Sequence, residues 1–347
     1  MIDLRSDTVT TPTDDMWRAM RDATLGDDTL EGDATVAELE TRGAELTGKP
    51  AALFVTSGTM GNVIAALAHN QRGGLEAIVD EQSHMALSEA GGLSCLAGLF
   101  CVALPSRRGE MDLTRLAARL RGGYSRYGGA TGLVCVETSH NHSGGWALSL
   151  DYLSEVRALS QAAGVPVHMD GARACNAAVA LGVGLTDIAG YADSMTFCLS
   201  KGLSAPMGSL LTGDTAFIQR ARTFRRMLGG GLRQAGIMAA AGLVALRQGI
   251  ERLADDHRTA RLIWQGLRDL DAGLVEETPP QTNILQVAVC PAAPDNTARW
   301  VDGLSRRGVL CRAARPGVLR LVTHRLVAET QIPEIVAAFR ALPPTLT

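Results

Sequence analysis

Three short apolar segments of this chain each lead into residues that could carry out chemistry. The segments span residues 51–56, 165–169 and 194–199, and they lead into Ser57-Gly58-Thr59, Asp170 and Lys201. Lysine and aspartate are rarely buried without a partner, so a lysine and an aspartate at the ends of apolar segments are candidates for a functional site. The Ser-Gly-Thr sequence precedes a helix-like pattern instead, where backbone N–H groups are free to bind an anion.

Each of these three features has an ordinary structural explanation as well as a chemical one. Ser57 could simply cap a helix, Asp170 could belong to a turn, and Lys201 could be a surface charge. In chemical terms, the glycine turn could hold a phosphate and the carboxylate could keep a ring nitrogen protonated. A partly desolvated lysine amine is nucleophilic and attacks an aldehyde. Together, and in this order, the three features favour a site for pyridoxal 5'-phosphate (PLP).

Several further side chains are candidates for the same site. Arg173 follows Asp170 closely and could bind a carboxylate through its planar guanidinium, or form a structural ion pair. His84 and His140 are expected at the edge of the sheet where a ligand would bind. Each could transfer protons there or be a structural histidine. Arg233 follows a glycine-rich turn and could contact a phosphate or a neighbouring chain, or lie in a plain loop. The other five histidines have weaker cases, and His168 is expected to face the packing around the sheet.

Composition limits the classes of function. The 347 residues are 46% hydrophobic and 20% charged, with a net charge of −3, which favours a soluble globular protein and not a nucleic-acid or membrane-surface binder. The charged start and the absence of a long apolar run predict a cytoplasmic protein. The seven cysteines include no CxxC pair and are expected to be reduced and mostly buried. No H-E-x-x-H motif or cysteine cluster indicates a metal.

The elements that must position these residues alternate along the chain. Short apolar segments and helix-like segments follow one another from residue 51 to 199, with one of the helices expected over 84–91. This alternation predicts an α/β fold with a mostly parallel sheet and its motifs at one edge. Residues 208–212 suggest a strand of opposite sense. A long helix is expected over 234–270, with a break near Gly249. We predict an N-terminal arm and large domain over 1–245 and a small α/β domain over 246–347.

The chain resembles a known family, the low-specificity L-threonine aldolases of the β-eliminating lyase family. The motifs that carry the resemblance are IDLRSDTVT, ELTGKPAALFVTSGTMGN, SEAGG, ETSHN, HMDGARACNA, CLSKGLSAPMGSLL, GGGLRQAGI and LRLVTH, spread over nearly the whole chain. The resemblance implies the PLP-dependent fold type I of aspartate aminotransferase, with a large, mostly parallel, seven-stranded sheet. It also implies a homotetramer, a dimer of dimers with shared active sites.

The resemblance further implies roles for individual residues. Lys201 would hold PLP covalently, Asp170 would pair with the ring nitrogen, and His84 would stack on the ring. The phosphate would be bound by Ser57, Gly58 and Thr59, with Arg233 from a neighbouring subunit. The residues expected around the substrate are Ser6, Arg173 and Arg320 at its carboxylate and His84 and His140 near its β-hydroxyl.

One position departs from the family pattern. The family commonly has a tyrosine after Gly-Asp-Asp, whereas this chain has Leu30 there. A leucine removes a hydroxyl group from the border of the site and would favour bulkier or more apolar aldehyde groups. Met85 and Ala86, which follow His84, also replace residues that are usually more polar or aromatic.

The expected reaction is a retro-aldol cleavage of a β-hydroxy-α-amino acid, such as L-threonine, to glycine and an aldehyde. His84, or a water held by the histidines, would take the proton of the hydroxyl group. Two alternatives stay open at this stage. One is another PLP reaction on the same fold, β-elimination or transamination, and the other is a catalytically silent PLP-binding protein.

Overall fold

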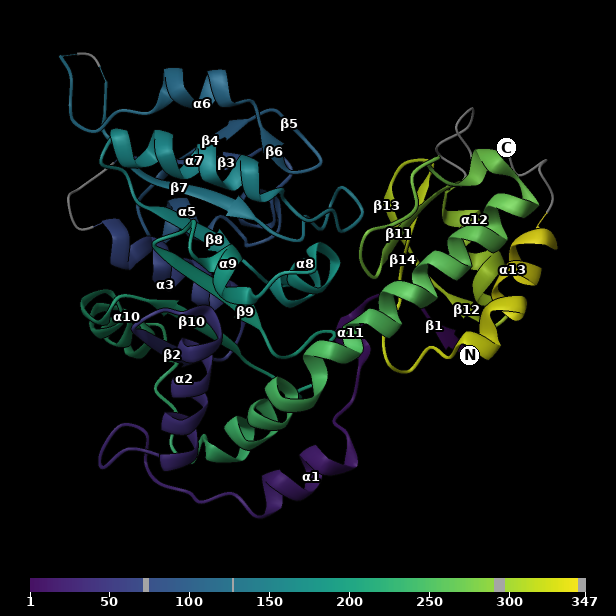
Figure 1. Cartoon of the computed structure of the whole chain (residues 1–347), viewed down its shortest axis with the longest axis horizontal. Coiled ribbons are helices and arrows are strands. Elements are labelled where there is room, and N and C mark those ends of the chain that lie inside the picture. The colour runs from purple at the N-terminus through teal and green to yellow at the C-terminus, as the bar shows by residue number, and fades with distance from the viewer. Residues whose placement is uncertain (71–74, 127, 290–296, 343–347) are drawn as a thin grey trace.

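The apolar segments of the sequence form a seven-stranded sheet in the computed structural model, which describes residues 1–70, 75–126, 128–289 and 297–342 (Figure 1). The strands lie in the order β2 (Ala51–Val55), β10 (Ser209–Gly213), β9 (Ser194–Cys198), β8 (Val167–Asp170), β7 (Thr131–Glu137), β3 (Glu76–Asp80) and β4 (Phe100–Leu104). β10 pairs antiparallel with both of its neighbours, and every other pairing is parallel. The predicted α/β class, the mostly parallel sheet and the strand of opposite sense are confirmed.

Both faces of the sheet are buried because successive strand residues belong to different cores. In β2, Ala52 and Phe54 join one core, and Leu53 and Val55 join another on the opposite face. The Leu53 face is covered by α3 (Gly58–His69) and α10 (Thr215–Met227). The Phe54 face is covered by α2 (Ala34–Thr47), α6 (Leu113–Arg119), α7 (Leu150–Ala162), α8 (Ala174–Leu181) and α9 (Leu185–Ala189).

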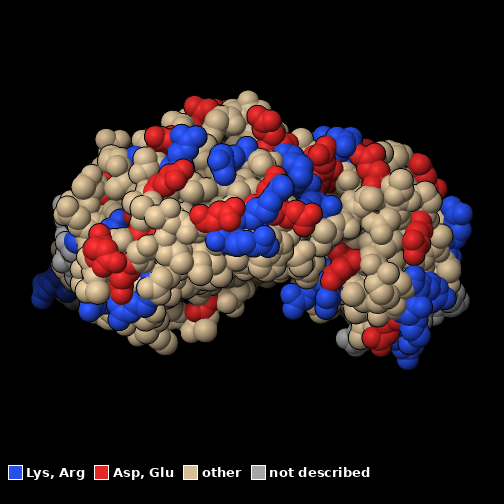
Figure 2. All heavy atoms as spheres, turned by 90° about the horizontal axis from the view of Figure 1, so that it is seen from below, with Lys and Arg blue, Asp and Glu red and all other residues tan. Residues whose placement is uncertain are grey.

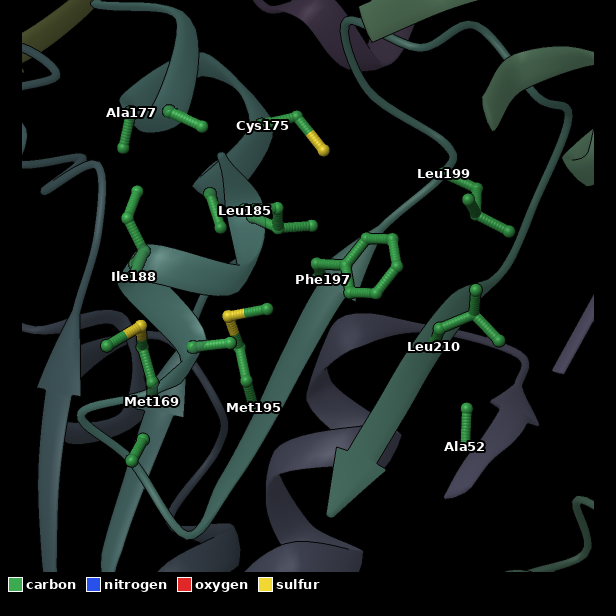
Figure 3. Close-up of a cluster of buried hydrophobic side chains, with 14 of the residues drawn as sticks. Ala52, Met169, Cys175, Ala177, Leu185, Ile188, Met195, Phe197, Leu199 and Leu210 are labelled. Atoms are coloured by element: carbon green, nitrogen blue, oxygen red, sulfur yellow. The ribbon is translucent and has the colours of Figure 1, made fainter. Parts of the chain in front are cut away.

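Figure 3 is a close-up of the core on the Phe54 face of the sheet. Met169, Met195 and Phe197 project from the strands toward Leu185 and Ile188 of α9. All five side chains are less than a tenth exposed. Burying side chains of this size stabilises the fold by about 1.5–3 kcal/mol each, so the sheet is a rigid base for the residues at its edge.

A smaller part of the molecule has a separate core around the C-terminal half of α11 (Gly236–Leu270). It contains a three-stranded sheet in the order β11 (Ile284–Ala288), β14 (Val318–Val322) and β13 (Arg312–Arg315). Helices α12 (Thr297–Ser305) and α13 (Ile332–Arg340) pack beside it, and β1 (Ile2–Asp3) pairs in parallel with β12 (Val309–Leu310). The N-terminus therefore begins in this smaller part and crosses to α1 (Asp14–Arg21), which packs on α11 (Figure 1).

Two predicted details are wrong. Helix α11 is uninterrupted at Gly249, where the missing side chain leaves room for Leu203, whose Cδ2 lies 3.1 Å from the position of an added Cβ. The helix expected over 84–91 is divided into α4 (His84–Leu87) and α5 (Gly92–Cys95), because Ala90 and Gly91 adopt φ angles of 51° and 74°. The domain boundary at 245/246 stays a prediction; along α11, Leu253 belongs to the large core and Ile263 to the small one.

The remaining elements are short. They are the β-hairpin β5 (Ser106–Arg107) and β6 (Glu110–Met111) and the 3-10 turns η1 (Asp7–Val9), η3 (Ala272–Leu274) and η5 (Glu329–Gln331).

The charged side chains and the cysteines can be placed within the described residues. On the face seen in Figure 2, acidic and basic side chains are interspersed. Within the described ranges, no helix combines the length and the apolar character needed to cross a membrane. Six cysteines are free thiols, four of them buried, and Cys290 lies outside the described residues.

Candidate active site

The carboxyl ends of the parallel strands bring four ionisable residues to one edge of the sheet. Asp80 ends β3, Glu137 ends β7, Asp170 ends β8, and Lys201 follows β9 after three residues. Glu137 and Asp170 are direct partners in the parallel register. The edge that ligands occupy in such sheets therefore contains both Asp170 and Lys201, as the sequence predicted.

Asp170 is held in place from two sides. Its Oδ1 atom accepts a hydrogen bond from the backbone N–H of Ala172 at 3.0 Å, and its Oδ2 atom accepts one from the Asn62 amide at 3.0 Å. The same amide donates to Glu89 Oε1 at 2.8 Å. Asp170 is 2% exposed, so a cationic ring nitrogen beside it would find a fixed and poorly solvated carboxylate.

His84 lies beside this carboxylate and is partly exposed. Its Nδ1 atom is 3.0 Å from Glu89 Oε1, and its backbone N–H donates to Glu137 Oε2 at 2.5 Å. The hydrogen bond to Glu89 raises the pKa of His84, and burial raises the pKa of Glu89. The side chain is 35% exposed, which leaves room for a planar ring against it.

His140 is placed more deeply than the sequence suggested. It is 1% exposed, with Nε2 2.5 Å from Asp80 Oδ2 and Nδ1 2.8 Å from Ser143 Oγ. Burial alone would lower the pKa of His140, but Asp80 and Glu137 raise it. Both ring nitrogens are engaged within the protein, so a direct role at the substrate stays a prediction.

Arg173 is already paired with a residue that sequence reasoning missed. Asp7 accepts hydrogen bonds from Nε at 2.8 Å and from Nη2 at 2.6 Å, and Asn283 donates to the same carboxylate at 3.2 Å. Burial would raise the pKa of Asp7, but Arg173 and Lys201 hold it well below its usual range. The only sequence signal for this pair was a charged residue in the non-periodic N-terminal arm.

Arg320, by contrast, has an unused donor. Its Nε atom is buried and has no hydrogen-bond partner among the described residues. Burial, and then the charge of Arg173, lower the pKa of Arg320 to about 10. A buried N–H donor without a partner is costly unless an anion binds it, so the Nε atom of Arg320 fits a carboxylate ligand. Ser6 lies next to Asp7, where its hydroxyl accepts from the Thr8 backbone N–H at 3.2 Å.

The turn that carries Lys201 is tied down at its backbone. The Lys201 carbonyl accepts from Ser204 N–H at 2.8 Å and from Thr10 Oγ1 at 2.9 Å. Ser204 has a φ of 67°, a conformation that non-glycine residues adopt only when their surroundings require it. The backbone is therefore fixed, and Lys201 is half-buried at the edge of the sheet.

The predicted phosphate turn begins α3, as expected. Ser57 caps the helix by accepting from Met60 N–H at 3.2 Å, which leaves the N–H groups of Gly58 and Thr59 without helical partners. Gly58 approaches β9 so closely that an added Cβ would lie 2.9 Å from Cys198 Sγ. Arg233 is exposed and contacts Asp27 and Thr29.

The fold and this edge define the class of protein: an α/β protein with a seven-stranded, mostly parallel sheet, a second α/β part and a lysine–aspartate–arginine site at the strand ends. The chain belongs to the β-eliminating lyase family, whose model matches residues 3–290. It is 40% identical over 342 residues to the low specificity L-threonine aldolase of Escherichia coli strain K12, which covers 98% of this chain and 99% of the relative.

Solved structures share the fold. The threonine aldolase of Leishmania major superposes with a TM-score of 0.82 at 19% identity, over 98% of this chain and 99% of the other. A high-resolution structure of SPT with PLP superposes with a TM-score of 0.73 at 20% identity, over 98% and 86%. These likenesses agree with the fold expected from the sequence.

Proposed function

We propose that this chain is a PLP-dependent aldehyde-lyase that cleaves L-threonine, L-allo-threonine and related β-hydroxy-α-amino acids to glycine and an aldehyde. The single observation that carries the proposal is the grouping of Lys201 and Asp170 at the strand ends with Arg320, whose buried Nε has no partner among the described residues, in a chain similar over nearly its whole length to low-specificity L-threonine aldolases.

The residues present fit PLP. Lys201 supplies the amine for the aldehyde, Asp170 the carboxylate for the ring nitrogen, and the partly exposed side chain of His84 a surface for the ring. Ser57, Gly58 and Thr59 supply the helix N-terminus for the phosphate. When bound, PLP withdraws electrons from the bond that breaks.

The substrate carboxylate would be bound mainly by Arg320. The charge of Arg173 is balanced by Asp7, whereas Arg320 is half-buried and its Nε donor has no partner among the described residues. Arg173 and Ser6 would line the same end of the substrate and fix its orientation. This orientation matters because the Cα–Cβ bond must lie perpendicular to the cofactor ring to break.

The β-hydroxyl proton would be taken at the opposite end. Glu89 holds Nδ1 of His84, so Nε2 is the ring atom left to move a proton, directly or through a water. His140 lies behind the site, paired with Asp80, and would set the charge around His84.

We further propose a cytoplasmic homotetramer, a dimer of dimers with shared active sites, that binds neither nucleic acid nor membranes. Arg233 contacts the loop that carries Asp27, Thr29 and Leu30, and Leu30 is 79% exposed. An exposed apolar side chain beside an exposed arginine suits contact with the active site of a neighbouring subunit.

The first test is glycine release by the PLP-loaded protein from L-allo-threonine, L-threonine and L-phenylserine. We expect glycine and the matching aldehyde from all three, with the rate order reporting the effect of Leu30. Pyruvate, or amine exchange that depends on a keto acid, would instead indicate β-elimination or transamination. Cofactor binding without turnover of any substrate would indicate a silent binding protein.

A further inference from the structure

A chain of hydrogen bonds runs between α3 and the strands β9 and β8 and ends on Asp170. His69 Nε2 is 2.7 Å from Ser194 Oγ, which is 2.8 Å from His168 Nδ1. His168 Nε2 is 3.0 Å from Asn62 Oδ1, and the Asn62 amide donates to Asp170. His69 and Asn62 lie on α3, Ser194 on β9, and His168 and Asp170 on β8.

The middle of this hydrogen-bond chain is inaccessible to water. Ser194 and His168 are fully buried, and Asn62 is 1% exposed. Each polar atom there depends on its protein partner, because a buried group that loses a hydrogen bond finds no water to replace it. The geometry therefore constrains which atom of each side chain carries a proton.

The carboxylates of Asp170 and Glu89 fix the direction in which the hydrogen bonds of this chain are donated. The same side of Asn62 faces Asp170 Oδ2 and Glu89 Oε1, so it must present its NH₂ group there, and its oxygen faces His168. Burial lowers the pKa of His168 to about 3, so its ring is neutral near pH 7 and has one donor and one acceptor. Nε2 must then carry the proton, and Nδ1 must accept.

The remaining protons follow from this assignment. Because Nδ1 of His168 accepts, the Ser194 hydroxyl must donate to it. Ser194 Oγ is then an acceptor toward His69, so Nε2 of His69 donates. Every hydrogen bond in the chain points toward Asp170, and hydrogen bonds aligned in this way strengthen one another.

We propose that Ser194, His168 and Asn62 are positioning residues that form a one-way donor chain, which keeps the Asn62 amide directed at Asp170 and so fixes the position of this carboxylate for the cofactor ring nitrogen. The inference rests on the proposed PLP function. Since Asn62 also donates to Glu89, the partner of His84, one amide orients both sides of the ring site.

The proton positions can be observed directly by neutron diffraction from crystals of the unmodified PLP-bound protein. Deuterium on Nε2 of His168 and on Nε2 of His69, with Nδ1 of His168 bare, supports the donor chain. Deuterium on Nδ1 of His168 overturns it, because Asn62 would then have to turn its oxygen toward two carboxylates.

A matched pair of variants tests the consequence. Ser194→Ala removes one hydroxyl from the chain, whereas Ser160→Ala removes a buried hydroxyl that has no partner among the described residues. We expect Ser194→Ala to raise the dissociation constant for PLP about tenfold, the size of one lost hydrogen bond, and to shift the pH midpoint of the cofactor's visible absorption. Ser160→Ala and the conservative Ser194→Thr should resemble wild type.

The outcomes separate this inference from the proposed function. A PLP affinity and a pH midpoint for Ser194→Ala equal to those of wild type would overturn the donor chain while glycine release by wild type still stands. If wild type releases no glycine, the proposed function fails, and the deuterium positions still decide the direction of the chain. If Ser194→Ala does not fold, the neutron measurement decides alone.

Discussion

At the scale of single residues, the two arginines of the site differ in how many of their hydrogen-bond donors have partners in the protein. Arg173 is 6% exposed and bound by both oxygens of Asp7, whereas Arg320 keeps a buried Nε without a partner among the described residues. The first is held as part of the fold, and the second has capacity left for a ligand. Substitutions at the two positions should therefore have different kinds of effect.

Arg320→Gln should raise KM for L-threonine about 10- to 100-fold, because a charge-assisted hydrogen bond to the substrate carboxylate contributes about 1.5–3 kcal/mol. The control is Arg315→Gln in the same small sheet, where the arginine is exposed and donates to Gln286. Steady-state kinetics with both variants measure the effect. Equal KM values for Arg320→Gln and wild type would show that Arg320 does not bind the substrate.

Asp7→Asn should lower the free energy of unfolding by about 3–5 kcal/mol, because it leaves the Arg173 guanidinium buried without its counter-charge. Urea unfolding measures this, with Glu45→Gln as the control in an exposed ion pair with Arg42. The folded-state pKa of Asp7 lies below its usual 3.8, so the contribution is present above that pH and is lost as the pH falls toward the folded value. The difference between wild type and variant should therefore shrink below about pH 4, and a constant difference would contradict the ion pair.

At the scale of elements, the lysine turn depends on α11, a helix shared by both cores. Leu253 of α11 is fully buried, and an added Cβ on Gly202 would lie 2.8 Å from its Cδ2 atom. The helix reaches from the large core to the small one, so it ties the Lys201 turn to the part of the molecule that carries Arg320. Its packing therefore sets the distance between the two ends of the substrate.

Leu253→Ala should lower the free energy of unfolding by about 2–5 kcal/mol, since the cavity would open directly behind the Lys201 turn. It should also weaken PLP binding, which absorbance titration measures. Leu262→Ala on the same helix is the control, because Leu262 is 39% exposed and should change stability by less than about 0.5 kcal/mol. Equal losses of stability and of PLP affinity in both variants would show that the packing of Leu253 against the Lys201 turn contributes no more than an exposed position on the same helix.

At the scale of the whole molecule, one chain supplies Lys201, Asp170 and Arg173 at the edge of the large sheet and Arg320 from β14 of the small sheet, whereas Arg233 contacts the loop that carries Leu30. The proposed oligomer explains this arrangement, since two copies related by a twofold axis could exchange these loops across the interface.

Subunit complementation tests the shared site. Lys201→Ala and Arg233→Ala should each be nearly inactive alone, and mixed oligomers should recover activity, because one site of each mixed pair has both residues intact. Random 1:1 pairing gives about one quarter of the wild-type sites, since half of the pairs are mixed and each has one intact site. Activity that stays at the sum of the separate variants would place Arg233 outside the neighbouring site.

Sequence reasoning predicted the alternation of strands and helices, the single edge and the place of Asp170 and Lys201 on it. Asp170 and Lys201 could be assigned because each follows an apolar segment, and parallel strands bring their carboxyl ends to the same edge whatever their order. The position of Ser57 before α3 was recognisable for a similar reason, since a helix start is a local signal. These features depend on short stretches of chain and on general rules of sheet topology.

Only the tertiary structure decided which side chains meet. Asp7 and Arg173 are 166 positions apart, and Asn62 and His168 are 106 apart, so no local pattern links them. The burial of His140 against Asp80 likewise depends on how β7 lies beside β3. The chain by itself determined what chemistry is available at the strand ends. Folding decided which charges are already neutralised and which remain for a ligand, because hydrogen bonding and desolvation act between groups that only the folded chain brings together.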